Sequence, residues 1–236
     1  NQVDVHLNTT VCADDLTSAG YEHVVVATGI SPRMPDLEGI DHPKVVSYID
    51  VIRGRVKVGK TVAVMGAGGI GFDVSELITH SGVSAAMDKD VFAREWGVDF
   101  NNHPRGGVTG VVPQVEAADR QVFLLQRKST RVGRGLGKTT GWTHRMSLVK
   151  RGVQMMNGLE YHRIDDQGLH VSVEGVPQVL EVDTVIICAG QLPKRSLYDD
   201  LAGANIAISL IGGAFEAAEL DAKAAIKQAS ELAAAI

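Results

Sequence analysis

Residues 61–71 read TVAVMGAGGIG, and this stretch decides the fold. The apolar run 61–65 ends at glycine, which is typical of a buried strand, and the residues up to about His80 follow the spacing of an amphipathic helix. Between these two elements Gly66, Gly68 and Gly71 form the pattern Gly-x-Gly-x-x-Gly. With a strand before it and a helix after it, this pattern indicates a dinucleotide-binding turn, and a purely structural glycine turn is the alternative.

The residues of this turn have separate tasks in the dinucleotide interpretation. Gly66 allows the tight turn, Gly68 lets the backbone approach a pyrophosphate, and Gly71 lets the helix pack closely on the strand. The first helical N–H groups, at Gly69 and Ile70, then face the phosphates together with the positive end of the helix dipole.

The end of the next strand bears on which dinucleotide is bound. An NAD site usually places Asp or Glu there, as an acceptor for the ribose 2′-hydroxyl. Here the strand 122–126 runs into Arg127, Lys128 and Ser129. Because an arginine can grip a 2′-phosphate with a planar fork of donors, this end favours NADPH over NADH. A solvated basic loop is the alternative.

Two similar strand endings flank this unit in the sequence. The run 24–27 leads to Thr28-Gly29, and the run 183–188 leads to Ala189-Gly190. Strands that alternate with helices predict an α/β fold with a parallel sheet, and the short alternating runs of 161–181 predict a β-meander. The pair of endings indicates that the chain leaves one domain, builds a second and returns. The expected segments are 1–49, 50–192 and 193–236, of which the first and last form one discontinuous domain.

Further segments carry separate expectations. Residues 1–7 resemble a strand already under way and lack an initiator methionine, which favours a fragment of a longer polypeptide. Residues 81–120 show no clear periodicity, so we expect a structureless insertion that serves as a lid or a docking surface. Helices are expected at 143–151 and from about Glu216 to the end. Lys138–Gly141 shapes the rim of the nucleotide pocket or is an ordinary loop, and Trp142 is expected in the core.

Composition excludes several classes of function. The net charge of −5 and pI of about 5.9 provide no electrostatic footprint for nucleic acid or for an anionic membrane. The two cysteines, Cys12 and Cys188, lack metal-ligand spacing, so no metal site is predicted and a reducing cytoplasm is favoured. No Ser-His-Asp or Cys-His arrangement is present, and no catalytic acid or base is predicted.

Four segments together carry a resemblance to a known family: GAGGIGFD (66–73), LQRKS (125–129), GLGKTTGW (135–142), and IGG (211–213) with ELDA (219–222). They closely resemble bacterial NADPH-dependent 2,4-dienoyl-CoA reductases. The similarity runs over essentially all 236 residues, and GLGKTTGW is far more specific than the nucleotide pattern.

This resemblance implies a series of cofactors that passes electrons to dienoyl thioesters, in fatty acid β-oxidation. An N-terminal flavin-binding TIM barrel precedes a pair of dinucleotide domains in such enzymes. Hydride passes from NADPH to FAD, and electrons continue through an iron–sulfur cluster to FMN, which reduces a 2,4-dienoyl-CoA.

The sequence departs from the family pattern by omission. The barrel and the cysteine cluster for iron are not in it, and the glycine pattern for the FAD pyrophosphate would lie upstream of Asn1. What the resemblance implies is an incomplete FAD-binding domain beside the Rossmann-like one, with weak FAD retention and no activity on acyl-CoA. Cofactor contacts outside the glycine turn and the basic loop are expected at Ala27, Thr28, Gly29, Ala189, Gly190, Gly212 and Gly213.

Other functions stay open. In an architecture like that of trimethylamine dehydrogenase, the corresponding site resembles a structural ADP-binding relic, against which Arg127 and Lys128 argue. A disulfide reductase of the thioredoxin-reductase type is disfavoured because no Cys-x-x-Cys occurs. A nucleotide-binding module without catalytic competence is the third possibility.

Overall fold

The chain folds as two compact units in a computed structural model that describes residues 3–101, 110–217 and 222–236. Unit 1 consists of Asn1–Arg33 and Gly190–Ile236, and unit 2 is the continuous segment Met34–Ala189. Both boundaries precede those expected from the sequence, at 49/50 and 192/193. The first lies earlier because the strand at 45–47 pairs within the sheet of unit 2.

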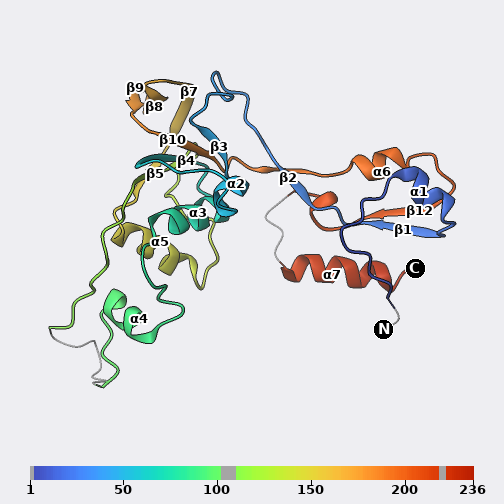
Figure 1. The fold of residues 1–236 in the computed structure, drawn as a ribbon, viewed down its shortest axis with the longest axis horizontal. Coiled ribbons are helices and arrows are strands. Elements are labelled where there is room, and N and C mark those ends of the chain that lie inside the picture. Colours follow the sequence, from blue (N-terminus) through green and yellow to red (C-terminus); the bar gives the residue numbers. More distant parts are fainter. Residues whose placement is uncertain (1–2, 102–109, 218–221) are drawn as a thin grey trace. The chain divides into compact units, whose positions relative to one another are not determined.

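A five-stranded parallel sheet forms the centre of unit 2 (Figure 1). Its strand order is β3-β10-β4-β5-β6, and every neighbouring pair is parallel. The strands are Val45–Ser47 (β3), Thr184–Ile187 (β10), Thr61–Met65 (β4), Gln121–Gln126 (β5) and Gln154–Asn157 (β6). The predicted α/β fold with a parallel sheet is therefore confirmed.

Helices cover one face of this sheet, and a meander covers the other (Figure 1). The helices on the first face are Tyr48–Ile52 (α2), Gly69–Thr79 (α3) and Gly141–Lys150 (α5). Along β4, Val62 and Val64 pack with these helices, whereas Ala63 and Met65 pack with the meander. Both faces of the strand are buried, which explains why its sequence is continuously apolar.

The meander is an antiparallel sheet of three strands, as the sequence predicts. Its strands are Leu159–Asp165 (β7), Gly168–Val173 (β8) and Val176–Leu180 (β9). Leu169 and Val171 of β8 are buried against the sheet, and a positive φ of 137° at Gly168 fits the hairpin that begins β8.

Unit 1 contains two short sheets and little core. Its elements are Ala13–Ser18 (α1), His23–Val26 (β1), Ile30–Pro32 (β2), Gln191–Pro193 (β11), Ser196–Asp200 (α6), Ala207–Leu210 (β12), Gly212–Ala214 (η1, a 3-10 turn) and Ala222–Ala233 (α7). β1 pairs with β12 in parallel, and β2 pairs with β11 in antiparallel fashion. Among its described residues only Val26, Leu201 and Ala214 are buried hydrophobic side chains.

Three local expectations were wrong. Residues 3–7 form no strand and are exposed, because no neighbouring strand pairs with them; residues 1–2 lie outside the described chain. The segment 81–120 is not structureless, since it contains the helix Lys89–Trp96 (α4); residues 102–109 lie outside the described part. Glu216 is not helical, and the described part of the final helix begins at Ala222.

Candidate dinucleotide-binding site

The glycine turn joins β4 to α3 at the carboxyl edge of the parallel sheet. Gly66 has a φ of 114°, which favours glycine, and a Cβ there would lie 2.2 Å from the carbonyl oxygen of Cys188, which directly follows the adjacent strand β10. A Cβ on Gly71 would lie 1.9 Å from the carbonyl oxygen of Gly66. Two of the three pattern glycines are therefore required by close backbone approaches, as this type of turn demands.

The opposite side of the turn is open. Gly68 is the N-cap of α3, its position provides no side-chain cap, and both it and Gly69 are exposed. A Cβ on Gly69 would meet no atom within 4 Å. Uncapped N–H groups beside open space form a cradle that suits a phosphate, so the residues present fit a dinucleotide pyrophosphate.

The sheet also brings the strand ending after β10 to this turn. Ala189 follows Cys188, whose N–H donates to the carbonyl oxygen of Met65 at 2.8 Å. The backbone nitrogen of Ala189 would lie 3.2 Å from a Cβ on Gly66. Of the strand-end residues predicted from the sequence, Ala189 thus lies in unit 2 beside the glycine turn, whereas Gly190 begins a segment of unit 1.

The basic loop after β5 is held in place by the ends of two strands. The Gln126 side chain donates to the carbonyl oxygens of Lys128 and Thr130, at 3.0 and 2.6 Å. Gly158 N–H donates to the Lys128 carbonyl at 3.1 Å, and the Asn157 amide donates to Ser129. The backbone is fixed while the side chains of Arg127 and Lys128 are exposed. They lie at the end of β5, next to the glycine turn, where a residue that binds the ribose 2′-phosphate is expected.

Tyr161 of β7 is a neighbour of this loop that sequence reasoning missed. Its hydroxyl is buried and has no hydrogen-bond partner among the described residues. Burial raises the pKa of this phenol, and the positive charge of Arg127 opposes that shift. No sequence signal reveals whether the hydroxyl of Tyr161 finds an acceptor.

The string GLGKTTGW (135–142) precedes α5 and enters its first turn. Gly141 N–H donates to the Gly137 carbonyl at 2.7 Å, and a Cβ on Gly141 would lie 2.5 Å from Cβ of Leu136. The string therefore folds tightly onto itself at the start of the helix. Trp142 is 63% exposed, so the expectation that it lies in the core was wrong.

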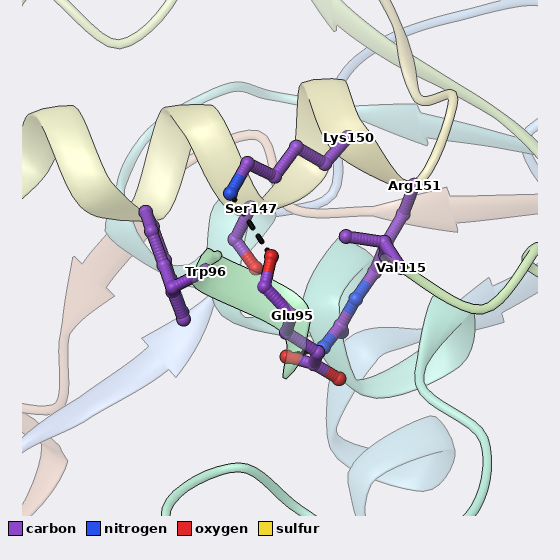
Figure 2. Close-up of a pocket in the computed structure, with 6 residues that line it drawn as sticks. All are labelled: Glu95, Trp96, Val115, Ser147, Lys150 and Arg151. Atoms are coloured by element: carbon purple, nitrogen blue, oxygen red, sulfur yellow. Dashed lines mark hydrogen bonds and ion pairs between the residues drawn. The ribbon is translucent and has the colours of Figure 1, made fainter. Parts of the chain in front are cut away.

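The insertion is docked on α5 through α4 (Figure 2). Lys150 Nζ donates to the Glu95 carbonyl at 3.2 Å and lies 4.0 Å from the centroid of the Trp96 ring. Trp96 also meets the edge of Trp142, at 6.5 Å between centroids. A cleft of about 290 Å³, open to solvent, lies between α3, α4 and α5; its lining includes His80, Glu95 and Trp96. Lys150 and Trp142 thus join α4 to α5, and the N–H of Gln114 also donates to the Arg94 carbonyl of α4 at 2.8 Å.

Unit 1 contains the remaining predicted cofactor residues. Thr28 Oγ1 donates to the Lys194 carbonyl at 2.6 Å, and Lys194 N–H donates to the carbonyl of Gly29 at 3.0 Å. A Cβ on Gly213 would lie 3.2 Å from the carbonyl carbon of Gly29, so the backbones of these two glycines approach closely.

One hydrogen-bond donor of unit 1 already has a partner within the protein. The Gly212 N–H, which the sequence interpretation directs at the flavin, donates to Oε1 of Gln228 at 2.7 Å. The residues of unit 1 therefore fit a flavin in part only: the close glycine approach is present, but this N–H is free for a ligand only if the Gln228 contact breaks.

The thiols and charged groups supply no redox or metal centre in the described residues. Cys12 and Cys188 are both free, and burial raises the pKa of the Cys188 thiol to about 12. No group of three or more metal-ligating side chains occurs in the described part of the chain. Among the same residues, no helix has the length and apolar character needed to cross a membrane.

Comparison with known proteins identifies relatives of this architecture. A family model described as pyridine nucleotide-disulphide oxidoreductase matches residues 1–213. A metal reductase of Desulforamulus reducens is 24% identical over 228 residues, which is 91% of this chain and 31% of that protein. A cinnamate reductase of Clostridium sporogenes is 22% identical over 202 residues, covering 84% of this chain and 24% of that protein.

Solved structures show the same fold. A 2-naphthoyl-CoA reductase complex aligns with a TM-score of 0.67 at 21% identity, covering 90% of this chain and 27% of that one. Histamine dehydrogenase from Rhizobium sp. 4-9 aligns with a TM-score of 0.62 at 16% identity, covering 89% and 30%. In all four cases the chain spans less than a third of the length of the protein it matches.

Proposed function

The chain belongs to the pyridine nucleotide-disulphide oxidoreductase family, and on that premise we propose that unit 2 binds NADPH as the electron-input module of a larger flavin-dependent reductase. The observation that carries the proposal is the end of β5. An exposed arginine and lysine stand there in place of a carboxylate, next to an open glycine turn at the same sheet edge.

The roles of the chain's own residues follow from this geometry. The turn 66–71 receives the pyrophosphate, and Arg127 with Lys128 selects the 2′-phosphate by charge-assisted hydrogen bonds. When bound, NADPH supplies a hydride to FAD, so the protein needs to orient the nicotinamide and requires no acid or base of its own.

The proposed substrate of the whole protein is a 2,4-dienoyl-CoA. Support comes from the GLGKTTGW string and from the names of two relatives, a naphthoyl-CoA reductase and a cinnamate reductase. The proposed partner of this chain is a barrel that contains FMN and an iron–sulfur cluster. Without it the chain has no site for the acyl-CoA reaction.

A nucleotide-binding module without catalytic competence is the second candidate. The similarity to histamine dehydrogenase is its support, since that protein shares the fold. The two candidates differ in one property: a non-catalytic ADP-binding relic has no need to distinguish NADPH from NADH.

Calorimetric titration of the purified chain tests the proposal. NADPH is expected to bind more tightly than NADH, and Arg127→Ala is expected to weaken NADPH roughly 10- to 150-fold, because a charge-assisted contact contributes about 1.5–3 kcal/mol. NADH affinity should stay unchanged in the variant. Equal affinity for both nucleotides, or no effect of Arg127→Ala, would favour the second candidate.

A further inference from the structure

Arg145 of α5 contains a buried donor that the protein leaves without an acceptor. Its Nε is buried and has no hydrogen-bond partner, and no ion pair holds the guanidinium among the described residues. An arginine stays charged at every physiological pH. Because burying a charged donor without an acceptor is destabilising, an unpaired group of this kind points to a ligand that completes it.

The sequence on either side of Arg145 contains no carboxylate that could pair with it. Residues 127–159 include no aspartate or glutamate but eight cations, namely Arg127, Lys128, Arg131, Arg134, Lys138, Arg145, Lys150 and Arg151. The carboxylates of the neighbouring helix α3 are directed elsewhere, since Glu76 pairs with His144 at 3.0 Å and Asp73 lies 3.8 Å from the same ring. In a chain of net charge −5, such a segment suits an anionic ligand.

The stem of Arg145 lies beside Gly133 and the buried ring of Phe72. Its Cδ would lie 3.6 Å from a Cβ on Gly133, and Cζ of Phe72 would lie 2.9 Å from the same point. Gly133 belongs to the loop that continues from Arg127. Phe72 directly follows Gly71, and its N–H donates to the Gly68 carbonyl at 3.1 Å. The stem of Arg145 therefore lies where the first turns of α3 meet the basic loop.

We propose that Arg145 binds a phosphate group of the dinucleotide. A guanidinium can bind a phosphate through two parallel N–H···O bonds, and such a contact uses donors that the protein leaves free. This inference rests on the proposed function and extends it, because it adds a phosphate ligand from α5 to those of the turn and of the loop after β5.

Titration of Arg145→Met and Arg145→Lys with NADPH and NADH tests the inference. We expect Arg145→Met to weaken binding roughly 10- to 150-fold, and Arg145→Lys to retain part of the affinity as a point charge. Equal weakening of both nucleotides assigns Arg145 to the pyrophosphate that they share, and weakening of NADPH alone assigns it to the 2′-phosphate. Arg94→Met, an equal change of charge on exposed α4, is the control and should have no effect.

Thermal unfolding of the same variants separates binding from a structural role. The nucleotide-free chain should melt at an unchanged or higher temperature in Arg145→Met, because no protein hydrogen bond is lost, while the upward shift that NADPH causes should shrink. A lower melting temperature of both nucleotide-free variants, matching their loss of affinity, would overturn the inference.

The titration also separates this inference from the proposed function. If the wild-type chain binds NADPH and the Arg145 variants bind it equally well, only the inference is overturned. If the folded wild-type chain binds neither nucleotide, the proposed function is overturned and the inference with it.

Discussion

Gly69 and Gly71 lie two positions apart in one turn, yet a methyl group at each would meet different surroundings. At Gly71 it would lie 1.9 Å from a backbone oxygen, and at Gly69 it would meet nothing within 4 Å. We expect Gly71→Ala to destabilise unit 2 by about 1–3 kcal/mol or more, because the helix must move off the strand. Gly69→Ala should leave the melting temperature unchanged or slightly higher but weaken NADPH, since the methyl occupies the space of the phosphate. A Gly69→Ala chain that binds NADPH normally would show that the phosphate approaches elsewhere.

The two thiols should differ in reactivity. Burial raises the pKa of Cys188 to about 12, so at pH 8 it is protonated and unreactive, and its thiolate forms only as the pH approaches that value. Cys12 is exposed. Alkylation of the native chain at pH 8 should therefore modify Cys12 quickly and Cys188 only after denaturation. Rapid modification of both thiols in the native chain would contradict the buried position of Cys188.

Sequence periodicity did not predict α4, although the local signals of this helix are present. Asp88 accepts hydrogen bonds from the N–H groups of Asp90 and Val91, and Gly97 ends the helix with a φ of 68°. These capping signals flank a helix of only eight residues that is polar on average and buries none of its side chains, so the caps are its clearest mark in the sequence. Trp96 packs against α5, and the carbonyls of Glu95 and Arg94 accept hydrogen bonds from Lys150 and Gln114; the sequence of α4 reveals none of these contacts.

Removing the Trp96 side chain tests the role of the insertion at residues 81–120. Trp96→Ala should release α4, since the ring contacts Phe92, Trp142 and Lys150, at a cost of about 1–2 kcal/mol for a half-buried aromatic side chain. Hydrogen exchange of residues 89–97 should become faster, while that of β4 and β5 stays slow. NADPH affinity should not change, because the turn and the basic loop belong to other elements. A clear loss of affinity would instead favour the lid interpretation of the insertion.

At the scale of the molecule, the two units differ in how much core they possess. Both hydrophobic clusters of the described chain lie entirely within Met34–Ala189. We therefore expect the excised segment 34–189 to unfold cooperatively and to bind NADPH with the affinity of the whole chain. The whole chain should retain little FAD, because unit 1 has few buried side chains and its Gly212 N–H is occupied. Circular dichroism melts and flavin absorbance after gel filtration measure both outcomes. An unfolded 34–189 segment would show that unit 1 supports it.

The sequence by itself determined the strands and helices around the glycine turn. β4 has the bounds that its apolar run predicts, β5 contains the predicted strand 122–126, and Gly66 and Gly71 lie where the turn needs them. These features follow from local backbone geometry, which repeats every two residues in a strand and every 3.6 in a helix. Only the tertiary structure decided the strand order β3-β10-β4-β5-β6, the docking of α4, the contact of Gly212 with Gln228 and the unpaired guanidinium of Arg145. Each of these depends on groups far apart in the chain, whose pairing is set by packing and by competition for hydrogen-bond partners.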